Sequence, residues 1–230
     1  MNKETSAMVG FAKLPLRWYR QQDVCHLATQ LLGKLLVTRL AGNVTVGRIV
    51  ETEAYAGITD QASHAFGGRF TPRTQVMYAA GGVAYVYLCY GLHQMFNVVP
   101  HAKGVPHAVL VRALEPLAGI EIMLQRRGKA RMDYTLTRGP GALAQAMGIN
   151  TRMSGVSLRS SQLFVADDGC AYPEEQIVKT PRIGVDYAGE HAAWPYRFHV
   201  KNCPWVSKMP SKKSKDGANN CNASCTLGVL

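Results

Sequence analysis

The sequence lacks the features that mark several common classes of protein. Its six cysteines show no paired CxxC spacing, and the opening residues lack the charged start and apolar core of a signal peptide, which predicts reduced thiols in a cytosolic protein. No apolar run approaches the ~20 residues that a membrane-spanning helix needs. GxGxxG and P-loop spacings are absent, which argues against a nucleotide-cofactor fold. The Cys221/Cys225 pair has no histidine nearby, so we expect no metal site.

Acidic residues are scarce relative to basic ones. Fifteen Asp and Glu face 26 Lys and Arg, which gives a formal net charge of +11 at pH 7. This excess favours a polyanionic partner, either nucleic acid or an anionic membrane surface. Without a membrane-spanning run, the membrane alternative loses its best support. Both halves of the chain carry the excess, so a basic tail alone does not account for it.

Length and composition indicate one globular domain with two different ends. The 230 residues are 47% hydrophobic, which is enough for one sizeable core. From Ser207 onward Lys, Ser, Asn and Gly dominate, a composition typical of disorder. We therefore expect a flexible segment over residues 1–13, a folded domain over 14–207 and a basic, disordered tail over 208–230.

The order of apolar and turn residues predicts a mixture of strands and helices. Asp23 should cap a helix that runs through Leu32, residues 116–125 should form a second helix, and Gly139-Pro140 should open a third. The expected strands are 35–40 and 44–55, joined as a hairpin, then 83–89, 95–99, 107–114, 163–166, 177–179 with 183–185, and 197–200. Residues 58–74 should form a loop. Because regular βαβ alternation is missing, the pattern favours an α+β domain.

The segment Val50-Glu51-Thr52-Glu53-Ala54-Tyr55, with His64 nine residues after Tyr55, has the densest chemistry in the chain. On a strand, Glu51, Glu53 and Tyr55 share one face with Ile49. Two carboxylates, a phenol and an imidazole are the parts of a water-activating site lined by flat rings. The alternative is that both glutamates are solvated or pair with arginines.

Further short motifs follow in a fixed order along the chain. They are Gly47 to Tyr55, His64 with Gly67-Gly68-Arg69 and Thr71-Pro72-Arg73, Tyr85-Val86-Tyr87, Tyr90-Gly91 with Asn97, Val111 to Pro116, Gly139-Pro140 with Asn150, Arg182-Ile183-Gly184-Val185, Gly189-Glu190 and Pro204-Trp205-Val206-Ser207. From about Leu14 to Ser207 the chain resembles the alkyladenine (3-methyladenine) DNA glycosylase family. One departure is Thr74, where that family often has Asn.

The resemblance implies a fold and an activity. The fold would be a single mixed α+β domain with a curved antiparallel sheet and flanking helices, distinct from the helix-hairpin-helix glycosylases. The activity would initiate base excision repair: a monomer flips an alkylated or deaminated purine out of double-stranded DNA and hydrolyses its N-glycosidic bond with an activated water. No metal or organic cofactor is implied. If the protein is bacterial, the enzyme would work in the cytoplasm and associate with the nucleoid. If the protein is eukaryotic, the enzyme would work in the nucleus.

The resemblance also implies catalytic residues. Glu53 would be the base that activates the water, and Arg112 with the backbone carbonyl of Ile183 would hold that water. The residues alone do not choose between Glu51 and Glu53, and the alternative for Arg112 is a surface ion pair. Two buried carboxylates would repel each other, so we expect Glu51 at a polar edge. No lysine lies between Lys34 and Lys103, so we expect a monofunctional enzyme without lyase activity.

Substrate and DNA contacts are implied in the same way. Tyr55, His64 and Tyr87 would stack on the flipped base, the backbone N–H of His64 would donate to it, and Asn97 would exclude guanine through its 2-amino group. Tyr90 would enter the minor groove with support from Leu92. Arg69 and Arg73 would bind DNA.

For several of these residues, alternatives without a catalytic or binding role remain. For each tyrosine the alternative is ordinary packing, and Tyr85 is assigned to that class. The remaining functional alternative is a noncatalytic nucleic-acid-binding module of the same fold. An RNA-processing or formyl-transfer enzyme finds no supporting motif.

Overall fold

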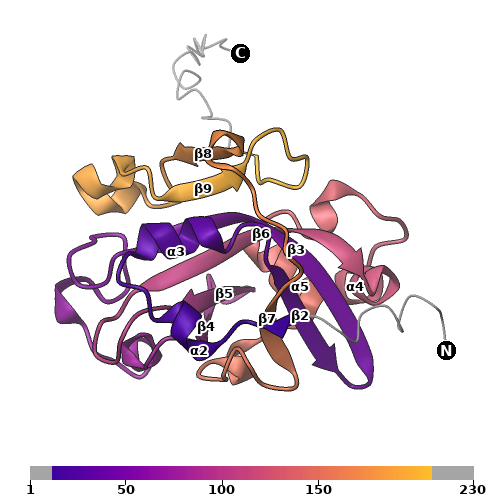
Figure 1. Ribbon diagram of the computed structural model, residues 1–230, viewed down its shortest axis with the longest axis horizontal. Helices are drawn as coiled ribbons and strands as arrows, with labels where there is room; N and C mark the ends of the chain where they lie inside the picture. The colour runs from indigo at the N-terminus through magenta and orange to yellow at the C-terminus, as the bar shows by residue number, and fades with distance from the viewer. Residues whose placement is uncertain (1–11, 209–230) are drawn as a thin grey trace, which may run out of the picture.

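The computed structural model describes residues 12–208 (Figure 1). The predicted basic tail, together with Cys221 and Cys225, lies outside these residues apart from Lys208. At the other end, residues 12 and 13 differ from the prediction of a flexible segment, because they form a short strand that pairs with Asp167 and Ala166.

Nine strands of the described residues form one sheet, and four α-helices and six short 3-10 helices accompany it. The strands are β1 (Ala12–Lys13), β2 (Leu35–Leu40), β3 (Asn43–Tyr55), β4 (Val83–Cys89), β5 (His93–Val99), β6 (Ala108–Ala118), β7 (Leu163–Asp167), β8 (Ile177–Thr180) and β9 (Arg197–Val200). The helices are α2 (Leu16–Tyr19), α3 (Val24–Gln30), α4 (Ile120–Arg127) and α5 (Pro140–Met147).

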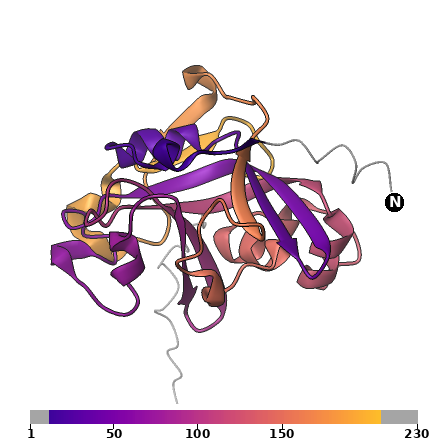
Figure 2. The same ribbon diagram turned by 60° about the horizontal axis from the view of Figure 1, so that its bottom comes forward.

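The sheet is antiparallel throughout its described pairs and strongly curled. Its order is β1-β7-β2-β3-β6-β5-β4, while β9 pairs with β3 and with β8. Figure 2 shows α3 above the long strands β3 and β6, with α4 and α5 below them. This arrangement confirms the α+β fold with a curved antiparallel sheet and flanking helices. The main core fills the space between these layers, with Leu27, Leu114 and Leu143 among its fully buried members.

Several elements lie where the local sequence predicted them. The Asp23 carboxylate accepts hydrogen bonds from the backbone N–H groups of Cys25 and His26, which caps α3 as predicted. The predicted hairpin is β2–β3, and its turn residues Ala41 and Gly42 both have positive φ, as a tight two-residue turn requires. Helix α5 begins at Pro140 and ends before Gly148, which was also predicted.

Two local predictions were wrong. Residues 116–118 belong to β6 and not to a helix. The strand tolerates Pro116 because this residue lies opposite Gly47 next to a register shift, where its missing N–H breaks no regular ladder bond. The helix begins only after Gly119, whose left-handed conformation turns the chain. Residues 183–185 form a bend and not a strand, which frees the Ile183 amide to bond a side chain.

An irregularity in the β3–β6 pairing determines where one charged side chain lies. Ile49 pairs with Leu114, Glu51 with Ala113, and Thr52 with Val111. Val50 is thus the extra residue on β3, and Arg112 is the extra residue on β6. Such bulges redirect side chains. Here the bulge lies where Arg112 reaches the two glutamates of β3.

Candidate active site

A pocket with a volume of about 520 Å³ collects most of the predicted site residues. It is lined by Tyr55, His64, Arg73, Tyr87, Tyr90, Asn97, Arg112 and Ile183, together with unpredicted residues that include Tyr85, Met95, Pro140 and Tyr187. These residues come from β3, β4, β5 and β6, from the β4–β5 turn, from the segment between β3 and β4, from the start of α5 and from the segment between β8 and β9. Glu53, Arg69 and Leu92 are not among the lining residues.

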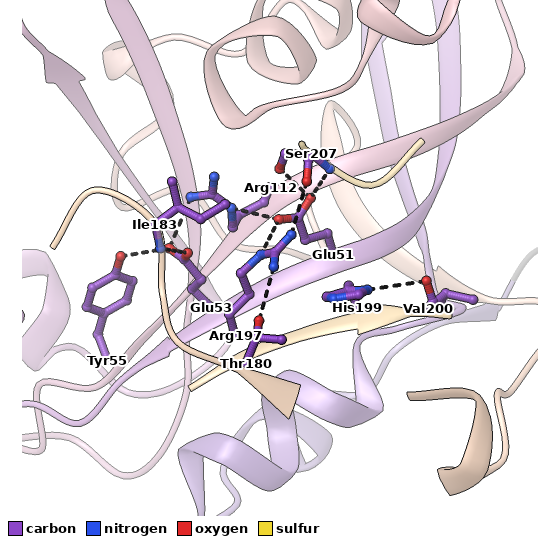
Figure 3. A network of polar contacts seen from close by, with 10 residues as sticks. All are labelled: Glu51, Glu53, Tyr55, Arg112, Thr180, Ile183, Arg197, His199, Val200 and Ser207. Atoms are coloured by element: carbon purple, nitrogen blue, oxygen red, sulfur yellow. Dashed lines mark hydrogen bonds and ion pairs between the residues drawn. The ribbon is translucent and has the colours of Figure 1, made fainter. Parts of the chain in front are cut away.

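Glu53 lies fully buried behind the pocket wall, held by three donors (Figure 3). Its Oε1 accepts from the Ile183 N–H at 2.8 Å, and its Oε2 accepts from the Tyr55 hydroxyl at 2.9 Å and from Arg112 Nη1 at 3.1 Å. All three donors line the pocket. A carboxylate offers about four acceptor directions, so these bonds leave roughly one on Oε1 for a further donor.

Glu51 contradicts the expectation of a polar edge, because its side chain is completely buried. Its Oε1 accepts from Arg112 Nε at 2.9 Å and from Arg197 Nε at 2.7 Å, while its Oε2 accepts from the N–H and hydroxyl of Ser207. The two arginines balance the charges of Glu51 and Glu53, so the repulsion that motivated the expectation is offset. Burial raises the pKa of Glu51, but the arginines and Ser207 bring this pKa below its usual value.

Arg112 is no surface residue, which excludes the surface ion pair as its role. It is 6% exposed and bridges the two carboxylates (Figure 3). Burial lowers the pKa of Arg112, and Glu53 and Glu51 more than compensate, so the net pKa lies above its ordinary value. The guanidinium therefore stays charged beside the pocket.

The bend that carries Ile183 is fixed by a buried ion pair that the sequence reasoning did not find. Arg182 donates to both carboxylate oxygens of Asp60 and, at 2.9 Å, to the carbonyl of Ala54. Its guanidinium also lies 4.8 Å from the ring centre of Tyr55. Arg182 belongs to one of the motifs singled out in the sequence, whereas nothing local points to Asp60 as its partner.

Aromatic rings line the pocket in contact with one another. The His64 and Tyr87 rings meet edge to face at 4.6 Å, and His64 Nδ1 lies 2.8 Å from the Tyr85 hydroxyl. Tyr85 is thus part of the pocket, not a packing residue alone. Burial raises the pKa of Tyr55, and the neighbouring Glu53 raises it further, so the Tyr55 hydroxyl keeps its proton and donates.

His64 is neutral, and its hydrogen-bond roles are defined. Arg73 Nη2 lies 3.2 Å from His64 Nε2, and an arginine can only donate, so Nε2 accepts and Nδ1–H donates to Tyr85. Burial, followed by Arg73 and Arg69, lowers the pKa of His64 to about 4. The guanidinium of Arg73 also lies 4.7 Å from the ring centre of Tyr87, inside the pocket.

Asn97 is oriented by backbone carbonyls. It lies on β5 with 3% exposure, and its Nδ2 donates to the carbonyls of Tyr85 at 3.1 Å and Met95 at 3.3 Å. Because both amide hydrogens are bound to the backbone, the side-chain oxygen is the polar atom left without a hydrogen-bond partner. The pocket wall therefore has one fixed acceptor at this position.

The tip of the β4–β5 hairpin projects apolar side chains beside the pocket. Tyr90 is 90% exposed and Leu92 is 79% exposed, and both Tyr90 and Gly91 have positive φ at the turn.

In the loop before β4, Thr74 accepts from the N–H of Thr71 and donates to the carbonyl of Arg69. Thr74 therefore provides hydrogen bonds for this loop, although it departs from the family pattern.

A further ring at the mouth of the pocket was not predicted. Tyr187 lines the pocket, is 69% exposed, and donates from its hydroxyl to the carbonyl of Ala62 at 3.2 Å.

Among residues 12–208, no group of three or more His, Cys, Asp or Glu side chains could hold a metal ion. No helix in the same range is both long and apolar enough to cross a membrane.

Comparisons with known proteins agree with the resemblance read from the motifs. A sequence model of the methylpurine-DNA glycosylase family matches residues 17–204. Relatives named "Putative 3-methyladenine DNA glycosylase" include one from Chlamydia felis, 44% identical over 80% of this chain and 94% of the relative. Two more are from Methanocella arvoryzae, 46% identical over 85% and 96%, and from Bacillus cytotoxicus, 43% identical over 85% and 100%. The chain belongs to the methylpurine-DNA glycosylase family, whose members are hydrolases of N-glycosyl bonds.

Proposed function

We propose that this protein is a monofunctional DNA glycosylase that flips alkylated or deaminated purines out of duplex DNA and hydrolyses their N-glycosidic bonds, which initiates base excision repair. The observation that carries the proposal is the buried Glu53 carboxylate, whose three donors all line an aromatic pocket. Membership of a glycosylase family favours this enzyme over a noncatalytic binding module.

Glu53 and its neighbours provide the chemistry. When the bond to the base breaks, the sugar develops positive charge, and a carboxylate stabilises that charge and accepts a proton from the attacking water. The acceptor direction left on Oε1 would receive this water. Arg112 would hold the water from the other side, together with the Ile183 carbonyl. An alkylated purine that is already cationic leaves readily, which favours this substrate class.

The pocket suits a flat, electron-poor base. Tyr55, His64 and Tyr87 offer ring faces and edges, and base–aromatic stacking contributes ~1–3 kcal/mol per base, which offsets the stacking lost on flipping. Because the pKa of His64 is about 4, its ring carries no charge at neutral pH and adds no second positive charge to that of Arg73 beside a cationic purine. Asn97 would reject guanine by placing its fixed amide against the 2-amino group.

The surface around the pocket would bind the duplex. Tyr90 would fill the gap left by the flipped nucleotide, Leu92 would support it, and Arg69 and Arg73 would contact phosphates. Each neutralised phosphate should add roughly −0.9 to the slope of log affinity against log salt. We propose that the protein acts as a monomer on double-stranded DNA, in the cytoplasm of a bacterium or the nucleus of a eukaryote.

The test is a base-release assay on duplexes that contain 3-methyladenine, 7-methylguanine, hypoxanthine or ethenoadenine. Release of at least one of these bases, with an intact abasic strand and no adduct trapped by borohydride, supports the proposal. A trapped adduct would show an amine nucleophile and refute the monofunctional mechanism. If no modified purine is released, the proposed function is wrong.

A further inference from the structure

Glu51 is a fully buried carboxylate to which the proposed mechanism gives no role. It accepts four hydrogen bonds, from Arg112, from Arg197 and twice from Ser207. In Figure 3, Arg112 lies between Glu51 and Glu53, Arg197 reaches Oε1 of Glu51 from β9, where it pairs with Glu53, and Ser207 binds the other oxygen of Glu51. Glu51 is therefore the only residue drawn there that joins Arg112 to Arg197 and Ser207.

The strand pairing does not fix the side chain of Arg112 by itself. Arg112 is the extra residue of a bulge and has no direct partner on β3. A long arginine side chain can adopt many rotamers, and fixing one of them requires bonds near its end. Glu51 supplies such a bond at Nε, 2.9 Å away, and Glu53 supplies the other at Nη1, 3.1 Å away.

The bond at Nε also limits how Arg112 can approach Glu53. A guanidinium beside a single carboxylate favours a two-pronged pair that occupies both oxygens. Because Glu51 binds the Nε edge, Arg112 presents only Nη1 to Oε2 of Glu53. Oε1 then keeps the direction that the mechanism needs for water. Without Glu51, Arg112 would be free to rotate into a two-pronged pair and block that direction.

The charge of Glu51 also keeps Arg112 from forming a two-pronged pair with Glu53. The buried cluster holds two arginines, Arg112 and Arg197, and two carboxylates, Glu51 and Glu53. If Glu51 were neutral, Glu53 would be the only charged carboxylate of the cluster, and no competing charge would draw Arg112 away from it.

We propose that Glu51 is a positioning residue, which holds the guanidinium of Arg112 in the one-pronged contact that leaves Glu53 able to bind and activate water. This role rests on the proposed glycosylase function. It also explains why the first glutamate of the hexapeptide is buried together with the second, instead of lying at a polar edge.

The test compares Glu51→Gln with the matched control Arg197→Gln. Each variant leaves one uncompensated charge in the same cluster, but only Glu51→Gln replaces the charged acceptor of Arg112 Nε with a weaker, neutral one. We expect Glu51→Gln to lower the single-turnover rate of base release about ten- to a hundredfold, the usual effect of losing a residue that orients a catalytic group. Its affinity for lesion DNA should change less than about twofold, and Arg197→Gln, which leaves the charged Glu51 beside Arg112, should lose clearly less rate than Glu51→Gln.

Two further variants keep the proposal testable if Glu51→Gln does not fold. Glu51→Asp keeps the charge but shortens the reach, so it should fold and still lose rate. In an Arg112→Gln background, adding Glu51→Asp should cause no further loss, because the two residues act as one unit.

Three outcomes would overturn the positioning role. They are equal rate losses in Glu51→Gln and Arg197→Gln, a wild-type rate in Glu51→Asp, or additive losses with Arg112→Gln. These results refute the role of Glu51 alone while the wild type still releases base. A wild type that releases no modified purine would instead refute the proposed function, and the role of Glu51 with it.

Discussion

The Nη1 atom of Arg112 lies 3.1 Å from Oε2 of Glu53, and both side chains are buried at the wall of an aromatic pocket. A buried ion pair of this kind is costly to desolvate and is weak evidence for stability alone. Its position behind a pocket, with one acceptor direction left on the carboxylate, instead fits a group that binds water.

Stability should depend on pH through His64. Its pKa is about 4 in the folded protein and 6.5 when unfolded, so the unfolded state binds the proton first as the pH falls. The stabilising contribution is therefore complete above pH 6.5 and is lost between pH 6.5 and about 4. Between pH 8 and pH 5 the wild type should lose roughly 2 kcal/mol more unfolding free energy than His64→Asn. Denaturant unfolding at both pH values measures this, and equal losses would refute the neutral, partly buried ring.

Arg73 should hold down the pKa of His64. Burial is the larger cause of that low pKa, and the charge of Arg73 is the second. Arg73→Ala should therefore raise the pKa of His64 above about 4 while leaving it below 6.5. An NMR titration of the His64 ring protons measures the change, with the exposed Arg152→Ala as control. A pKa that does not move would place the Arg73 side chain away from the ring in solution.

Asn97 should determine whether normal guanine is accepted. Its amide is fixed by the carbonyls of Tyr85 and Met95, so it cannot turn away from an incoming 2-amino group. Asn97→Ser should raise release of undamaged guanine by about ten- to two-hundredfold, the range for removing one steric conflict in a pocket. Release of undamaged adenine, which lacks the 2-amino group, is the internal control. If guanine release stays at the wild-type level, the exclusion lies elsewhere.

The Asp60–Arg182 pair should be required for stability. Both side chains are completely buried, and Arg182 also holds the bend that carries Ile183. Asp60→Ala would leave an uncompensated charge and should cost about 3–5 kcal/mol in unfolding free energy. Glu174→Ala, which breaks an exposed pair with Lys179, should change stability little. Comparable effects of the two variants, measured by chemical denaturation, would contradict the buried pair.

Features encoded by neighbouring residues were predictable from the sequence. The Asp23 cap, the β2–β3 hairpin and helix α5 each depend on residues close together in the chain. The pocket residues were recovered through motifs whose order matched a family, and the structure brings Tyr55, His64 and Tyr87 together. Their roles in catalysis stay predictions.

Features that depend on distant contacts were not predictable. Glu51 is buried because Arg197 and Ser207, 146 and 156 residues away, supply its donors. Asp60 pairs with Arg182, which lies 122 residues further along the sequence, and no local pattern predicts that pairing. The position of Arg112 depends on a bulge, which strand alternation does not reveal. In each case the side chain's surroundings come from segments that are far apart in the sequence.

The most direct test of the account is the single-turnover rate of base release by Glu53→Gln, measured on lesion DNA beside the exposed control Glu121→Gln. The amide keeps the shape of the side chain but cannot accept a proton from water. We expect the rate to fall by about 10²- to 10⁴-fold, with lesion binding largely preserved and the control unchanged. A Glu53→Gln enzyme that binds the lesion and releases the base at the wild-type rate would contradict the assignment of Glu53 as the water-activating group.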